Sequence, residues 1–132
     1  MCGISGFCNL HTDFFEREPY YRKILSDMSD ALYHRGPDSH GIYLTSHAGL
    51  SHTRLAIIDP NGGLQPMTRH YCDTDFTIVY NGELYNTKEL RAELISHGIT
   101  FRTHSDTEVI LNGFLFYGPS FVQKINGIFA FA

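Results

Sequence analysis

The sequence predicts an α+β domain in which helices pack against sheets. Three observations support this fold class. Runs rich in β-branched and aromatic residues alternate with segments of helical periodicity, glycine and proline separate these segments, and hairpin-type turn signals are present. The 132 residues are 42% hydrophobic and 18% charged, which is ordinary for one domain with a core. No repeat, low-complexity segment or composition shift marks a linker, so we expect one domain over residues 1–132.

The N-terminal part is expected to form a strand, a helix and two more strands. The apolar residues Ile4, Phe7 and Cys8 predict a strand over Cys2–Leu10. Helical spacing predicts a helix over Pro19–His34, which Gly36-Pro37 would end because proline disfavours helical geometry in the residue before it. Short β-type runs over Gly41–Leu44 and Gly49–Ile58 predict the two further strands.

The middle of the chain carries the strongest turn signal. Phe76–Tyr80 is a β-prone run, and Asn81-Gly82 follows it directly. Asn-Gly is typical of two-residue hairpin turns, so we expect Glu83–Tyr85 to pair back onto the first run.

Two helices are expected after this turn. Asn86 and Glu89 resemble a capping box that opens the first, and Gly98 is placed to end it. The apolar face of this helix would consist of Leu90, Leu94 and Ile95. A short strand is predicted over Ile99–Arg102.

The last predicted helix opens at Ser105–Glu108, which has the pattern of a capping box. Gly118-Pro119 would end it, and Ile128–Ala132 predicts a final strand. Because an apolar strand stands at the very end of the sequence, we expect the domain to be incomplete at its C-terminus.

Composition argues against several classes of protein. The net charge is −4 and the basic residues are scattered, which does not suggest a nucleic-acid or anionic-membrane partner. No apolar run approaches the roughly 18 residues that span a bilayer. Three cysteines without a signal peptide indicate reduced thiols and a cytoplasmic location. Eight histidines show no metal-ligand spacing, so we expect no metal site.

Cys2 is the first candidate catalytic residue. If Met1 is removed, one residue carries both a thiol nucleophile and a free α-amine. The unperturbed pKa of an α-amine is roughly 7.7–8.0, so this group can act as the base for its own thiol. The alternative is an inert, buried cysteine, which is the commoner role of this residue type.

Other residues could complete a site of this kind. The Asn81 amide and the Gly82 N–H could form an oxyanion hole, or the pair could be an ordinary hairpin turn. Arg54 could bind a carboxylate with both guanidinium nitrogens, or could face water at a strand end. Glu83 could bind an ammonium group or face solvent. Asp106 could also bind an ammonium group, or could only cap its helix.

Several segments together resemble the class II glutamine amidotransferases, which are N-terminal-nucleophile hydrolases. More narrowly, the chain resembles the glutaminase domain of glutamine-dependent asparagine synthetases. The resemblance covers the whole sequence and rests on Met1–Phe7, His34–Asp38, Arg54–Asp59, Gln65–Met67, Tyr80–Asn86, Ser105–Leu111 and Asn126–Phe131.

The resemblance implies a four-layer αββα sandwich and a role for each candidate. Cys2 would attack the side-chain amide of L-glutamine, with Asn81 and Gly82 as the oxyanion hole. Arg54 would bind the α-carboxylate of glutamine, and Asp106 and Glu83 its α-ammonium group. Backbone groups of the segment Leu55, Ala56, Ile57 and Ile58 would line the same pocket. His34–Asp38 would be structural, with Arg35 as a further candidate.

The resemblance also implies what this chain lacks. In the family, a larger synthetase domain uses ATP and Mg to activate aspartate and receives the ammonia, and we expect those cofactors only there. We therefore expect a partial glutaminase domain that needs a synthetase domain or chain, and open sheet edges that favour a homodimer or marginal stability. A non-catalytic glutamine-binding or scaffold module, and a β-lactam synthetase-like amidotransferase, remain as alternatives.

Overall fold

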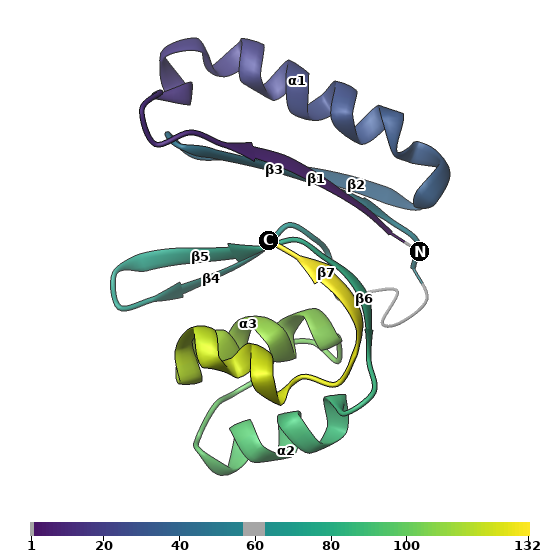
Figure 1. Ribbon diagram of the computed structural model, residues 1–132, viewed down its shortest axis with the longest axis vertical. Coiled ribbons are helices and arrows are strands. Elements are labelled where there is room, and N and C mark those ends of the chain that lie inside the picture. Colours follow the sequence, from purple (N-terminus) through teal and green to yellow (C-terminus); the bar gives the residue numbers. More distant parts are fainter. Residues whose placement is uncertain (1, 57–62) are drawn as a thin grey trace.

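The chain folds into four layers, which are a helix, two successive layers of strands and a pair of helices (Figure 1). This computed structural model describes residues 2–56 and 63–132. The arrangement confirms the predicted αββα sandwich. The N-terminal half supplies the first helix and sheet, and the C-terminal half supplies the other two layers (Figure 1).

The first sheet has three antiparallel strands with β3 in the centre. Its strands are β1 (Gly3–Cys8), β2 (Ser39–Leu44) and β3 (Ala48–Arg54), in the order β1-β3-β2. The register pairs Gly3 with Thr53 and Ser39 with Arg54. This pairing puts the beginning of β1 beside the end of β3, so residue 2 lies next to residues 54 and 55.

Helix α1 (Glu18–Ala31) covers the outer face of this sheet, between the 3₁₀ turns η1 (Phe14–Arg17) and η2 (Tyr33–Arg35). A small aromatic and aliphatic core joins the helix and sheet, formed by Phe7, Phe14, Tyr21, Leu25, Met28, Ile42 and Leu44. The predicted strands and helix are confirmed here, but α1 ends at Ala31, before the predicted end at His34, and β3 ends at Arg54. The expected continuation through Leu55 and Ala56 is wrong, and Ile57 and Ile58 lie outside the described residues.

The second layer of strands is built from two antiparallel pairs. Strand β4 (Met67–Tyr71) pairs with β5 (Thr74–Ile78), and β6 (Tyr80–Leu84) pairs with β7 (Gly127–Phe131). The hairpin is therefore upstream of the predicted one. Its turn is Cys72-Asp73, where both residues have positive φ, 48° and 58°.

The predicted hairpin turn at Asn81-Gly82 is wrong. Both residues lie inside β6, where Asn81 pairs with Ala130 and Gly82 with Phe129. The long-range partner β7 decides the conformation here and overrides the local preference of the dipeptide. Gly82 is still required, because a Cβ would overlap the carbonyl oxygen of Ile128 and lie 2.7 Å from the Cα of Phe129.

Helices α2 (Thr87–Ser96) and α3 (Asp106–Tyr117) form the last layer, and the 3₁₀ segment η3 (Gly118–Lys124) leads to β7. Ser105 caps α3 as predicted, accepting a hydrogen bond from the Glu108 amide at 3.3 Å. The capping box of α2 is wrong. The Asn86 amide instead binds the backbone of Lys124 at 2.8 Å and of Asn126 at 2.9 Å.

Two further expectations in this region are wrong. Ile95 is 55% exposed, so the apolar face of α2 consists of Leu90 and Leu94. Residues 99–102 form no strand. The Glu108 carboxylate accepts hydrogen bonds from the amides of Arg102 and Thr103 instead, at 2.7–3.1 Å.

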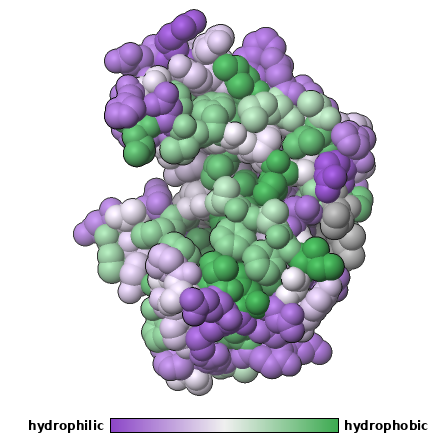
Figure 2. Space-filling model, viewed as in Figure 1, coloured by the Kyte–Doolittle hydropathy of each residue, from purple (hydrophilic) through white to green (hydrophobic). Residues whose placement is uncertain are grey.

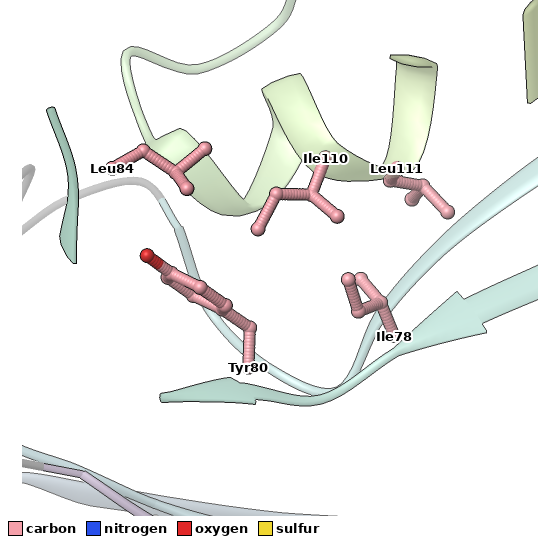
Figure 3. Close-up of a cluster of buried hydrophobic side chains, with 5 residues drawn as sticks. All are labelled: Ile78, Tyr80, Leu84, Ile110 and Leu111. Carbon is pink, nitrogen blue, oxygen red and sulfur yellow. The ribbon is translucent and has the colours of Figure 1, made fainter. Parts of the chain in front are cut away.

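The core of the second half lies between β5, β6 and α3. Figure 3 shows its buried members, which are Ile78, Tyr80, Leu84, Ile110 and Leu111. The surface is mixed in hydropathy and is indented on the side where the first sheet and the β4–β5 hairpin diverge (Figure 2). No helix in the described parts of the chain is long and apolar enough to cross a membrane.

Candidate active site

A pocket of about 330 Å³ lies between the two strand layers. It is formed where the beginning of β1 and the end of β3 meet β6 and the N-terminus of α3. Its lining residues are Cys2, Arg54, Leu55, Gly63, Gln65, Tyr80, Asn81, Gly82, Glu83, Tyr85, Ser105, Asp106, Thr107 and Ile128. The fold thus brings together most of the residues that the sequence singled out. Ala56 is not among this lining, and Ile57 and Ile58 lie outside the described residues.

Cys2 is held at the pocket through both its backbone and its sulfur. The next amide, Gly3 N, donates to Thr53 Oγ1 at 3.2 Å, and Arg35 Nε donates to the Cys2 carbonyl at 3.1 Å. The thiol accepts from Leu55 N at 3.4 Å and lies 3.7 Å from Leu55 O. Cys2 is only partly buried, so the structure places its sulfur at the pocket surface and not in the hydrophobic core.

The segment after α1 fixes the end of β3. Asp38 N donates to the Arg54 carbonyl at 3.0 Å, and the Asp38 carboxylate accepts from Ala56 N at 2.7 Å. Arg54 itself is 6% exposed and lines the pocket with Leu55. The predicted structural role of residues 34–38 fits these contacts, since both Arg35 and Asp38 hold backbone groups beside the pocket.

Strand β6 presents Asn81 and Glu83 to the pocket. Side chains alternate along a strand, and Tyr80 and Leu84 face the core under α3. Asn81 and Glu83 therefore project from the opposite face, toward the first sheet, and both line the cavity with Gly82. A side-chain amide, a backbone amide and a carboxylate thus line the same pocket as the Cys2 thiol.

Asp106 is the first residue of α3 and is 8% exposed. Its Oδ1 accepts from Thr107 N at 3.0 Å, and its Oδ2 accepts from the Tyr80 hydroxyl at 2.8 Å. The N-terminus of a helix favours a negative charge at this position. The pocket therefore contains the cation Arg54 and two carboxylates, those of Glu83 and Asp106, a pattern that suits a small zwitterion.

Sequence reasoning assigned no role to several pocket residues. Gln65 bridges two elements: its Oε1 accepts from Tyr80 N at 2.5 Å, and its Nε2 donates to Thr107 Oγ1 at 3.2 Å. Gly63 lies between Arg54 and Ser105 with a φ of +66°, which favours glycine. Gln65 begins the segment Gln65–Met67 of the family resemblance, and Tyr80 directly precedes Asn81. Neither position in the sequence indicates these contacts by itself.

His52 lies behind the pocket on β3 and is 1% exposed. Burial lowers its pKa from 6.5 to about 4; a hydrogen bond with the Tyr80 backbone opposes this shift, and the charge of Arg54 adds to it. Its Nε2 has no hydrogen-bond partner within residues 2–56 and 63–132. His52 is therefore neutral at neutral pH. Over the same residues, no group of three histidine, cysteine or acidic side chains is arranged to hold a metal ion.

Comparison with known proteins gives one family and a consistent set of relatives. The model of the glutamine amidotransferase domain family matches residues 1–132. Asparagine synthetase [glutamine-hydrolyzing] 3 of Bacillus subtilis (strain 168) is 42% identical over 132 residues, 100% of this chain and 21% of the relative. Asparagine synthetase B [glutamine-hydrolyzing] of Escherichia coli (strain K12) is 41% identical over 132 residues, 100% of this chain and 23% of the relative. The chain thus spans about a fifth of the length of these curated relatives.

A solved structure shares the fold. It is the glutamine phosphoribosylpyrophosphate (PRPP) amidotransferase of B. subtilis, complexed with ADP and GMP. The TM-score is 0.55 at 24% sequence identity, over 67% of this chain and 21% of that chain. At this identity the likeness bears on the fold alone.

Proposed function

Because this chain belongs to the glutamine amidotransferase domain family, we propose that it hydrolyses the side-chain amide of L-glutamine through a thioester on Cys2. One observation carries the proposal: a single pocket combines a thiol with one buried cation and two carboxylates. Glutamine is a zwitterion whose reactive amide is at the other end of a short chain. A pocket that binds both charges of its backbone can direct this amide toward the sulfur.

The charges suggest how the substrate is bound. The Arg54 guanidinium binds the α-carboxylate, since its planar donors match a carboxylate with two parallel hydrogen bonds. Asp106 and Glu83, which line the same pocket, bind the α-ammonium group. Backbone groups of residues 55–58 complete the binding surface, with Leu55 as the member whose contact to Cys2 the structure describes.

The chemistry follows from the nucleophile and the groups facing it. After Met1 is removed, the α-amine of Cys2 takes the thiol proton and the sulfur attacks the amide carbon. The Asn81 side chain and the Gly82 amide donate hydrogen bonds to the oxyanion that forms. The C–N bond then breaks and the nitrogen leaves as ammonia with the proton held by the amine. Water attacks the resulting thioester, which releases glutamate and restores the thiol.

We propose that the ammonia is used outside this domain. The relatives that the chain matches are asparagine synthetases about five times its length. In our proposal a separate synthetase domain or chain amidates aspartate with this ammonia, and ATP and Mg act there. The glutaminase step itself requires only protein groups and water. We place the reaction in the cytoplasm, where the thiol stays reduced.

A glutaminase assay with matched cysteine variants tests the proposal. Glutamate and ammonia release would be measured for the parent chain, Cys2→Ala and Cys8→Ala. Cys8 is the control because it ends β1, the strand that Cys2 directly precedes, and is exposed outside the pocket. We expect C2A to lose activity and C8A to keep it. Equal activity in C2A and the parent would refute the nucleophile.

Intact mass distinguishes catalysis from binding alone. We expect the active preparation to lack Met1, because a retained Met1 blocks the α-amine. A parent chain that lacks Met1, binds glutamine and releases no ammonia would instead support the non-catalytic binding alternative.

A further inference from the structure

We propose that Tyr80 is a positioning residue that holds the Asp106 carboxylate for the α-ammonium group of the substrate, and so makes the pocket select for ligands that carry this amine. The inference rests on the proposed function. It extends that function to a residue in the core under α3, to which no role has been assigned above.

The hydrogen bond between the two side chains joins the core to the pocket. The ring of Tyr80 packs with Ile78, Leu84 and Ile110, and Figure 3 shows its hydroxyl group at the edge of this cluster. From there the hydroxyl donates to Asp106 Oδ2 at 2.8 Å, and both residues line the pocket. Tyr80 is 3% exposed and Asp106 8% exposed, so water competes little for this bond.

The phenol is suited to act only as a donor. Burial, followed by the charge of Asp106, raises the pKa of Tyr80 far above its ordinary value. The hydroxyl therefore remains protonated over the whole working range of pH. Because its one proton is directed at Oδ2 and the Thr107 amide is directed at Oδ1, the carboxylate plane is fixed from both ends.

Gln65 holds the two elements that carry this pair. Its side chain accepts from the backbone of Tyr80 at 2.5 Å and donates to Thr107 Oγ1 at 3.2 Å. The beginning of β6 and the first turn of α3 are thus tied together within one residue of the Tyr80–Asp106 bond. A free aspartate at a pocket rim would sample several rotamers, and its ordering would cost affinity when the ligand binds.

Core packing alone offers a competing explanation. A buried tyrosine hydroxyl needs an acceptor, and Asp106 could serve only that purpose. The two explanations differ in what they predict for ligands. A purely structural bond affects all ligands alike, whereas a positioned carboxylate affects only ligands with an α-ammonium group.

Binding measurements in a Cys2→Ala background distinguish the positioning role of Tyr80 from core packing alone. The Cys2→Ala chain is used because it does not consume the ligand. Calorimetry would compare L-glutamine with 5-amino-5-oxopentanoate, the analogue that lacks the amine. We expect Tyr80→Phe to weaken glutamine binding about tenfold and to change analogue binding less than about twofold. Tyr117→Phe is the matched control, because its hydroxyl also donates to a carboxylate, that of Glu93, away from the pocket. We expect it to change neither affinity.

Several results would overturn the proposal. Equal weakening of both ligands by Y80F, or no weakening of either, would assign Tyr80 to packing alone while the proposed function stands. Failure of the Cys2→Ala chain to bind glutamine at all would refute the substrate, and with it this inference. Thermal melting checks that Y80F is folded. If it is not, Gln65→Met tests the same network and is expected to show the same selective loss for glutamine.

Discussion

Acidification is expected to destabilise this fold through His52, a neutral histidine that is 1% exposed between the two strand layers. Its folded-state pKa is about 4, against 6.5 for an unperturbed side chain. As pH falls below 6.5, the unfolded chain binds a proton at this position and the folded chain does not. The unfolded state is therefore favoured progressively, and the loss of stability is complete near pH 4.

The gap between the two pKa values sets the size of the effect. A shift from 6.5 to about 4 corresponds to about 3 kcal/mol of unfolding free energy, lost between those two pH values. A domain of this kind is stable by about 5–15 kcal/mol, so one histidine removes a substantial share. The effect is large because the imidazole is buried and would lose its hydration on becoming charged; the nearby charge of Arg54 adds to the shift in pKa.

Urea unfolding followed by circular dichroism at pH values from 7.5 to 4 measures this loss. His52→Asn keeps a polar side chain but cannot titrate, and the difference between parent and variant cancels the contribution of the acidic residues. His11→Asn, at an exposed position, is the control and should follow the parent. Parallel pH curves for parent and H52N would refute the reasoning, because they would show that His52 does not stay neutral in the folded state.

Three further predictions concern the pocket and the assembly. Gly82→Ala should cost about 1–3 kcal/mol of stability, because its Cβ meets the backbone of Ile128 and Phe129. Steady-state kinetics should also show kcat reduced about 100-fold, since the oxyanion donors move with β6. Arg54→Lys should raise the KM for glutamine about tenfold, with kcat little changed, because an ammonium lacks the planar fork; an unchanged KM would contradict the assignment. Sedimentation should show a homodimer, or else an unfolding experiment should show a broad transition. A monomer that unfolds cooperatively would contradict the prediction that open sheet edges cause dimerisation or marginal stability.

The fold could be predicted where local signals and long-range packing agree. Pro19 lies in the first turn of α1, Ser105 caps the start of α3, and Gly98 and Gly118, both with positive φ, stand at the ends of α2 and α3. These signals act within one or two turns of backbone, and at these positions the long-range packing agrees with them.

The errors occur where a distant residue satisfies the backbone. Asn81-Gly82 would form a turn in isolation, but β7 supplies a partner strand from residues 127–131. Residues 99–102 have extended character, yet the buried carboxylate of Glu108 binds the amides that a neighbouring strand would have bound. The actual turn at Cys72-Asp73 contains no glycine and therefore gave no strong signal.

The candidate site could be predicted only through the family resemblance. Its predicted residues lie directly before β1, at the end of β3, in β6 and at the start of α3, and neither spacing nor periodicity indicates that these parts of the chain converge. Gln65 and Tyr80 hold other pocket residues in place. The sequence did not predict this role, because their contacts depend on side-chain geometry. A tyrosine at an alternating position of a strand is predicted to lie in the hydrophobic core. That prediction is correct for the ring of Tyr80 but gives no partner for its hydroxyl group.

The pocket is divided between the two strand layers. Cys2, Arg54 and Leu55 lie in or directly beside the strands of the first sheet, whereas Asn81, Gly82, Glu83 and Asp106 belong to the second half of the molecule. Any small sliding of one layer over the other would therefore alter the separation between attacking atom and bound amide while leaving every helix and strand intact. The catalytic rate would then change with a small misalignment of the two layers that a measurement of secondary structure would not detect. Low concentrations of urea should abolish turnover before the far-ultraviolet spectrum changes.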